Sequence, residues 1–435
     1  MSNDFGKDEF LKGSLVLILS LGIFNVLNYV FQMSMARLLG PAEYGILAVL
    51  MSLVYIFSIP SEGIQTITSS YASRFNVKKE NGKIRDLMIR GLKKGLVFSV
   101  GIFFIFGLIS FWLSNLLRIS NSLLLITGLV LFGSFTMPIT RGILQGTKRF
   151  SALGMNMILE AALKVILAIS LVIVGLGAIG GIFGLILALF GAFILSFLPL
   201  KFIINSKRER NDFGQVYSYN LPGLVAITSI VLIYSLDIIF ARIFFNPVLA
   251  GQYAFMSLVG KVIFFANMAV GKAMFPLTFE KSAMGIGTGE IFKKAFMLTS
   301  AVCLVALVFY FFFPVQVIKT ISLGSSQYTE VSGILILLGI AFSFVSFSNL
   351  LVLYNLSTNR MQKTYFPLLV FVIMEVLLFQ FFHSNLIEFS LVVVFSSFIM
   401  LLYLLILSLI KRKSKKQRAE HLFPQKSTDF RGSEN

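Results

Sequence analysis

The chain of 435 residues is too apolar and too poor in charge for a soluble protein. Apolar residues make up 57% and charged residues 13%, about half of the ~25% charge of an ordinary globular domain. These values exclude a soluble enzyme, a nucleic-acid-binding domain and a secreted disulfide scaffold. The net charge of +18 therefore indicates membrane orientation and contact with anionic lipids.

Twelve apolar runs are long enough to cross a membrane as helices, since a crossing takes about 20 residues. They are continuous rather than alternating, which excludes an outer-membrane barrel. We therefore predict an all-α integral membrane protein with about 12 transmembrane helices, at residues 14–36, 45–70, 95–117, 122–144, 151–175, 178–200, 221–245, 253–277, 295–318, 331–356, 364–383 and 387–410.

The basic residues predict the orientation. With a cytoplasmic N-terminus, 30 of the 37 Lys and Arg fall in the tails and inward loops, and the outward turns keep Arg37, Arg118 and Lys319. This asymmetry is the positive-inside bias, which an odd number of helices would destroy. Both termini are expected on the cytoplasmic side of the cell membrane.

Two pairs of loops indicate an internal repeat. RLLGPAEYGILA at 37–48 is echoed by PVLAGQYAFM at 247–256, and GTKRF at 146–150 by STNRM at 357–361, with offsets of 209 and 211. Two six-helix lobes with the same orientation follow, at 1–205 and 206–410, related by a pseudo-two-fold axis along the membrane normal. The remaining residues, 411–435, are expected to form a basic, disordered cytoplasmic tail.

RLLGPAEYG, followed by IPSEGIQ and LQGTKRF, resembles the polysaccharide biosynthesis (Wzx-type) flippases, and so does AGQYAF. These flippases belong to the multidrug/oligosaccharidyl-lipid/polysaccharide (MOP) exporter superfamily, with the lipid II flippase MurJ and the MATE drug exporters. The resemblance implies a V-shaped, two-lobed bundle. Its cavity would pass the glycan and diphosphate of a polyprenyl-linked oligosaccharide to the outer leaflet by alternating access.

Charged residues inside the membrane are functional candidates because burying them in lipid is costly. Asn156, Glu160 and Lys164 lie at i, i+4 and i+8, on one face of the run 151–175. Two interpretations stay open: Glu160 and Lys164 neutralise one another, or Lys164 faces the cavity and meets the diphosphate while Glu160 tunes it.

Further cations lie in the runs 221–245 and 253–277. A diphosphate needs fixed positive charges, and Lys serves as a point-charge phosphate binder. The resemblance places these helices along the cavity, which favours Lys261 and Arg242 for anion contact. The alternative is internal pairing with Asp237, or snorkelling of Arg242 and Lys272 to the surface.

Polar residues of the first helix are candidates for the substrate passage. Arg37 closes the helix and either anchors it at the outer interface or contacts the passing headgroup. Asn25, Asn28 and Gln32 form a stripe at i, i+3 and i+7 that could line a sugar passage or join helices by hydrogen bonds.

Gating and ion coupling have candidates of their own. Pro60 could bend the second helix as a hinge, because proline frees a backbone carbonyl. Glu62, Asp237, Glu160 or Glu375 could carry a proton or sodium ion, since a buried carboxyl can be tuned toward neutrality. The single cysteine, Cys303, is expected to be a buried thiol.

The sequence predicts no cofactor, no metal centre and no enzyme, because it has no phosphate-binding loop, no metal-spaced Cys or His and no nucleophile elbow. The expected partners are a lipid-linked oligosaccharide, anionic lipids and, transiently, polysaccharide-assembly proteins, with no nucleic acid. An ion-coupled MATE-like multidrug antiporter and a membrane glycosyltransferase or polymerase remain as alternatives.

Overall fold

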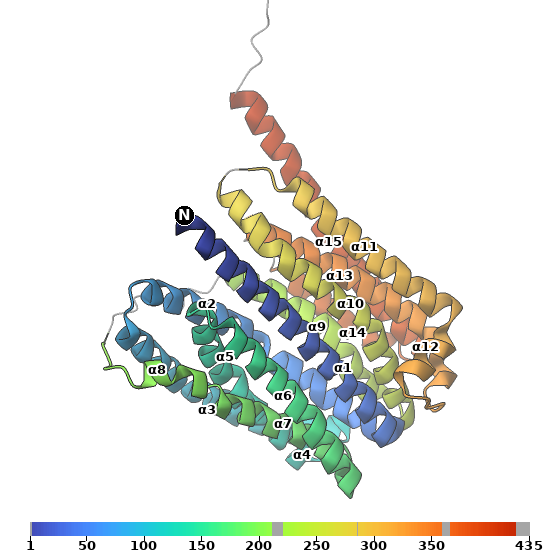
Figure 1. Cartoon of the computed structure of the whole chain (residues 1–435). Coiled ribbons are helices and arrows are strands. Elements are labelled where there is room, and N and C mark those ends of the chain that lie inside the picture. Colours follow the sequence, from blue (N-terminus) through green and yellow to red (C-terminus); the bar gives the residue numbers. More distant parts are fainter. Residues whose placement is uncertain (1, 211–220, 285, 359–365, 423–435) are drawn as a thin grey trace, which may run out of the picture.

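The computed structural model describes residues 2–210, 221–284, 286–358 and 366–422, which are helical almost throughout (Figure 1). Nine helices within these ranges are long and apolar enough to cross a membrane. The prediction of an all-α membrane protein is confirmed.

The first helix, α1 (Ser2–Phe57), is two helices joined at a sharp turn. Its 56 residues would span about 84 Å as one straight rod, far more than the ~30 Å hydrocarbon core. Gly40 has a φ of 68° and precedes Pro41, a combination that a residue with a side chain rarely adopts. The chain turns back there and continues into α2 (Ile59–Val77) (Figure 1).

A second long apolar stretch, Phe150–Ile204, also reverses direction. Its helices α6 and α7 pack along one another on either side of Gly175 and Gly177, which both have positive φ. The helices of this first half after α2 are α3 (Asn81–Leu117), α4 (Asn121–Gly128), α5 (Val130–Gly146), α6 (Phe150–Leu171), α7 (Gly177–Leu195) and α8 (Lys201–Ile204).

The second half begins with α9, and its helices are α9 (Leu221–Phe244), α10 (Pro247–Ala283), α11 (Gly289–Phe312), α12 (Pro314–Ile321), α13 (Leu335–Ser357), α14 (Leu368–Phe381) and α15 (Leu386–Leu422). The Asn246 side chain caps α10 by accepting from the Leu249 amide at 2.9 Å. Disorder was expected from residue 411, but α15 continues to Leu422; residues 423–435 lie outside the described ranges.

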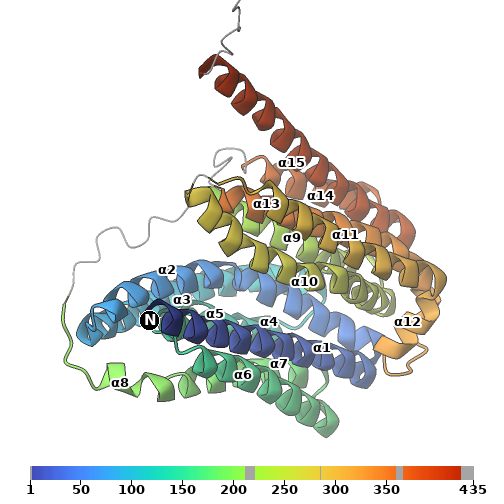
Figure 2. The ribbon, with the colours of Figure 1, turned by 45° about the horizontal axis from the view of Figure 1, so that its top comes forward.

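The halves lie side by side and meet along α1, which packs against α6 of its own half and against α9 and α10 of the other (Figure 2). Large apolar side chains are exposed on peripheral helices, including Phe104 and Phe111 of α3 and Leu304 and Phe311 of α11. Acyl chains of the bilayer cover such surfaces in a membrane protein.

Candidate functional site

The halves meet along a seam between α1, with its continuation α2, and α10. The rings of Tyr44 and Phe255 lie 5.9 Å apart, and those of Tyr55 and Phe265 lie 6.2 Å apart. Further along, Lys272 Nζ lies 3.1 Å from Glu62 Oε1, a separation of 210 positions in the chain. In each of these three contacts, the α1 or α2 residue meets the α10 residue about 210 positions later.

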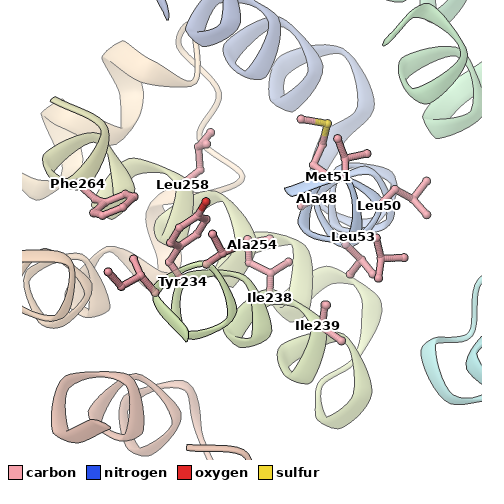
Figure 3. Close-up of a cluster of buried hydrophobic side chains, with 14 of the residues drawn as sticks. Ala48, Leu50, Met51, Leu53, Tyr234, Ile238, Ile239, Ala254, Leu258 and Phe264 are labelled. Carbon is pink, nitrogen blue, oxygen red and sulfur yellow. The ribbon is translucent and has the colours of Figure 1, made fainter. Parts of the chain in front are cut away.

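The seam residues of α1 and α2 follow a heptad-like spacing, at 44, 48, 51, 55 and 62. This spacing is typical of helices that pack in parallel with side chains interleaved. Between the two helices lies a cavity of about 20 Å³, bordered by Ala48, Met51, Leu258 and Lys261. A volume of this size holds about one water, and apolar side chains of α1, α9 and α10 fill the surrounding space (Figure 3).

One end of the seam, which we call the closed end, is sealed by backbone contact. A Cβ placed on Gly251 would lie 1.7 Å from the carbonyl oxygen of Pro41, and one on Gly45 would lie 2.9 Å from the Gly251 Cα. Tyr328 donates from its hydroxyl to the Ala36 carbonyl at 2.8 Å and packs its ring on Phe255. These contacts join the halves without leaving room for a solute.

The other end, the open end, is marked by Glu62 and Lys272. Their side chains are 61% and 52% exposed although they touch across the seam. The space beside them is therefore open, and the halves diverge from the closed end to the open end.

A buried charge cluster lies in the second half. Lys261 Nζ of α10 is 3.1 Å and 3.3 Å from the two carboxylate oxygens of Asp237 in α9, and Ser257 also donates to Asp237. Glu375 of α14 is fully buried in electrostatic range of both charges. Neither Glu375 oxygen has a hydrogen-bond partner within the described part of the chain.

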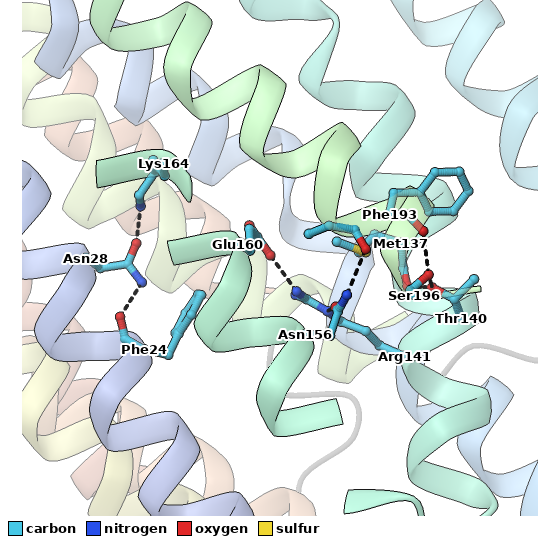
Figure 4. A network of polar contacts seen from close by, with 11 residues as sticks. Phe24, Asn28, Met137, Thr140, Arg141, Asn156, Glu160, Lys164, Phe193 and Ser196 are labelled. Carbon is cyan, nitrogen blue, oxygen red and sulfur yellow. Dashed lines mark hydrogen bonds and ion pairs between the residues drawn. The ribbon is translucent and has the colours of Figure 1, made fainter. Parts of the chain in front are cut away.

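In the first half, Arg141 of α5 lies between two side chains of α6 (Figure 4). Its guanidinium donates to Glu160 Oε2 at 2.5 Å and to Asn156 Oδ1 at 2.9 Å. The Asn156 amide donates in turn to the Ala192 carbonyl of α7 at 2.7 Å. The direct ion pair of Glu160 is therefore with Arg141 of the neighbouring helix and not with Lys164.

Lys164 points from α6 to α1, where it donates to Asn28 Oδ1 and lies 4.7 Å from the centre of the Phe31 ring. Gln32 accepts a 3.4 Å hydrogen bond from Tyr44 and borders the small cavity of the seam. Asn25 is exposed. Two of the three polar residues predicted on the first helix thus make contacts inside the protein.

Arg242 of α9 binds the end of α3 in the other half. It donates to the carbonyls of Leu117 and Arg118 at 3.0 Å and 3.2 Å and is buried. A cation at a helix C-terminus is stabilised by the helix dipole and satisfies carbonyls that the helix leaves free. Arg242 thus joins the halves near the closed end, and it does not snorkel to the surface.

The remaining candidates lie apart from these clusters. Arg37 is exposed beside the Gly40 turn. Pro60 lies in the first turn of α2, directly after the interruption at Ser58, where its missing amide proton costs nothing. Cys303 is buried, as expected.

Comparison with known proteins decides the family. Residues 10–281, which include the whole seam, match the family of polysaccharide biosynthesis proteins. The chain belongs to this family. Its fold is the one seen in solved structures of a MATE transporter and of MurJ.

One relative by sequence and two solved structures are similar to the chain. An uncharacterized membrane protein of Methanocaldococcus jannaschii, MJ1375, is 26% identical over 386 residues, covering 80% of this chain and 89% of that protein. A MATE-family multidrug transporter in an inward-facing conformation superposes with a TM-score of 0.72 at 14% identity, covering 92% of this chain and 99% of that one. The lipid II flippase MurJ, in an inward closed conformation, gives 0.70 at 14% identity, covering 90% and 87%.

Sequence reasoning missed two features of this family member. Arg141 lies within the predicted run 122–144, but it was counted among the cytoplasmic basic residues and not among the intramembrane candidates; in the structure it lies inside α5 and binds Glu160. The apolar turn that follows it, Gly142-Ile143-Leu144, was a signal that the helix continues. The pairing of α1 and α2 with α10 along the seam has nearly the same offset as the internal repeat. It could have been predicted from that repeat if these helices had been assumed to pack against each other.

Replacing Arg141 by Met should destabilise the protein by about 1–3 kcal/mol, because Glu160 then loses its charged partner in a half-buried site. The double variant Arg141→Met/Glu160→Gln should recover most of that loss, since no unpaired charge remains. Thermal unfolding in detergent measures both variants. Equal destabilisation of the single and double variants would mean that the ion pair does not organise α5 against α6.

Proposed function

We propose that the chain flips a polyprenyl-diphosphate-linked oligosaccharide from the cytoplasmic to the outer leaflet, for export of a cell-surface polysaccharide. The observation that carries this proposal is membership of the polysaccharide biosynthesis family over residues 10–281. The seam supports it, because two halves closed at one end and open at the other suit alternating access.

The proposed topology has twelve crossings in two six-helix lobes, 1–205 and 206–410. The two long apolar stretches each reverse direction and would cross twice, and the short helix α14 would add one more crossing. With both termini cytoplasmic, as the distribution of Lys and Arg favours, the open end faces the cytoplasm. The arrangement is then inward-facing and V-shaped.

In this proposal, the intramembrane cations bind the substrate diphosphate in another conformation of the protein. Lys164, Lys261 and Arg242 are held by protein groups in this conformation. They become available to a diphosphate only when these contacts break. Asp237 and Glu375 form a buried acidic site that could couple transport to a proton or sodium ion.

Flipping can be measured with purified protein in liposomes containing a fluorescent lipid-linked glycan. We expect the protein to expose the glycan to an impermeant quencher or lectin faster than empty liposomes do. Protein that leaves the leaflet distribution unchanged, with and without an imposed proton or sodium gradient, would contradict the proposal.

The second candidate is an ion-coupled multidrug antiporter. The inward-facing MATE transporter favours it through its fold, and the buried acids Asp237 and Glu375 favour it through their charge. Efflux of organic cations from the same liposomes distinguishes the two functions. Gradient-driven drug efflux without glycan flipping would select the antiporter.

A further inference from the structure

The ion pair at the open end links a helix of the first half to a helix of the second. Glu62 lies on α2 and Lys272 on α10, with 3.1 Å between carboxylate and ammonium. Within the described ranges, it is the one ion pair between a helix of the first half and a helix of the second. The buried pair Lys261–Asp237, by contrast, lies inside the second half.

The exposure of this pair makes it weak. An ion pair between exposed side chains contributes little to stability, so it cannot hold the halves together against a competing anion. Glu62 offers one negative charge, whereas a diphosphate brings at least two and several acceptor oxygens. A diphosphate that reaches Lys272 would therefore displace the carboxylate.

The α2 side of the pair is polar and exposed. Glu62, Thr66, Ser70 and Arg74 are exposed at intervals of four residues along one face of α2. A lipid-facing helix of this protein, α3, exposes apolar side chains instead. The exposed face of α2 is thus suited to a water-filled passage that a charged headgroup could follow.

The exposed face of α10 leaves room beside the lysine. Ala269 and Ala273, which are exposed on either side of Lys272, are too small to cover its ammonium group. The other intramembrane cations are engaged: Lys261 by Asp237, Lys164 by Asn28, and Arg141 by Glu160. Lys272 is the cation of this set whose partner can leave without exposing a buried charge.

We propose that Lys272 is the first contact of the substrate diphosphate, and that Glu62 holds its place until the substrate arrives. This inference rests on the proposed function and adds to it a site and an order of events. Exchange of Glu62 for the diphosphate removes the one ion pair between the halves at the open end. Binding would thereby free the halves to move.

Binding of farnesyl diphosphate, a soluble polyprenyl diphosphate, tests the contact. The protein is held in nanodiscs of zwitterionic lipid at fixed ionic strength, because salt screens exposed charges. Lys272→Gln should weaken binding about tenfold or more, as expected when a charged hydrogen bond is lost, and Lys272→Arg should restore most of it. Glu62→Gln should strengthen binding, because the internal competitor is gone.

The opposite changes in affinity expected for Lys272→Gln and Glu62→Gln distinguish a binding site from a pair that only joins the halves. If the pair only joined the halves, Glu62→Gln and Lys272→Gln would change binding in the same direction, and that result would overturn the proposal. Lys281→Gln, at an exposed lysine in the last turn of α10, is the matched control and should leave binding unchanged. Equal affinities for Lys272→Gln and Lys281→Gln would also overturn it.

Two further measurements separate this inference from the proposed function. Farnesol has the same type of tail without phosphates, and its binding should not depend on Lys272 or Glu62. A dependence on either residue would refute the diphosphate contact. Flipping of the lipid-linked glycan by wild-type protein is read independently, so its absence refutes the proposed function whatever the binding series gives.

Discussion

Replacing Gly251 by alanine should force the halves apart at the closed end and abolish flipping. The new Cβ would lie 1.7 Å from the Pro41 carbonyl oxygen and 2.4 Å from its carbon, and these are backbone atoms that cannot rotate away. The contact can be relieved only by moving α10 away from the Gly40 turn. A transporter that cannot close this end cannot complete its cycle.

Cysteine labelling measures this opening directly. In a Cys303→Ala background, Met51→Cys places a thiol at the buried cavity of the seam. An impermeant maleimide added from the outside should label it rapidly with Gly251→Ala and slowly without it.

Graded controls accompany the Gly251 variant. Gly45→Ala should have a smaller effect, because its nearest backbone atom is at 2.9 Å, and Gly101→Ala should have none, because nothing lies within 4 Å. Normal flipping by Gly251→Ala, with slow labelling of the seam thiol, would show that the backbone contact is not a feature of the working transporter.

Replacing Lys261 by Met should strongly destabilise the protein. It leaves Asp237 buried without its cation and beside Glu375, and breaking a buried ion pair in this way costs about 3–5 kcal/mol. We expect a clear fall in the unfolding temperature in detergent. Transport should also fall, because α9 and α10 both border the seam.

Two companion variants test whether an unpaired buried charge causes this loss of stability. Lys261→Met/Asp237→Asn should recover most of the stability, since no unpaired charge remains. Glu375→Gln should leave the unfolding temperature unchanged or raise it, because neither Glu375 oxygen has a hydrogen bond within the described chain. A Lys261→Met protein as stable as wild type would mean that Asp237 does not need the lysine.

Much of the architecture follows from the sequence. Apolar runs and loops predicted the helices, because lipid demands internally satisfied backbone hydrogen bonds. The reversal at Gly40 also lay between two predicted runs. The continuation of α15 to Leu422 was missed, because a charged sequence such as KRKSKKQR carries no apolar periodicity that would predict a helix.

The partners of the buried charges were harder to predict. Helical spacing places Glu160 and Lys164 on one face, but it does not say which neighbouring helix faces them. In the structure, Arg141 of α5 binds Glu160, and Asn28 of α1 binds Lys164. For Lys261, pairing with Asp237 was one of two interpretations left open, and the structure contains that ion pair. Contacts between helices far apart in sequence are set by packing rather than by local pattern.

Pulsed-EPR distances test the central claim, that a diphosphate-bearing lipid drives the halves to open and close in alternation. One label pair, Leu38 and Val248, lies at exposed sites near the closed end, and a second, Ser70 and Leu277, at exposed sites of α2 and α10 toward the open end. On addition of lipid-linked oligosaccharide, the first distance should lengthen while the second shortens. Distances that stay unchanged with this lipid, or that change together in one direction, would contradict the account.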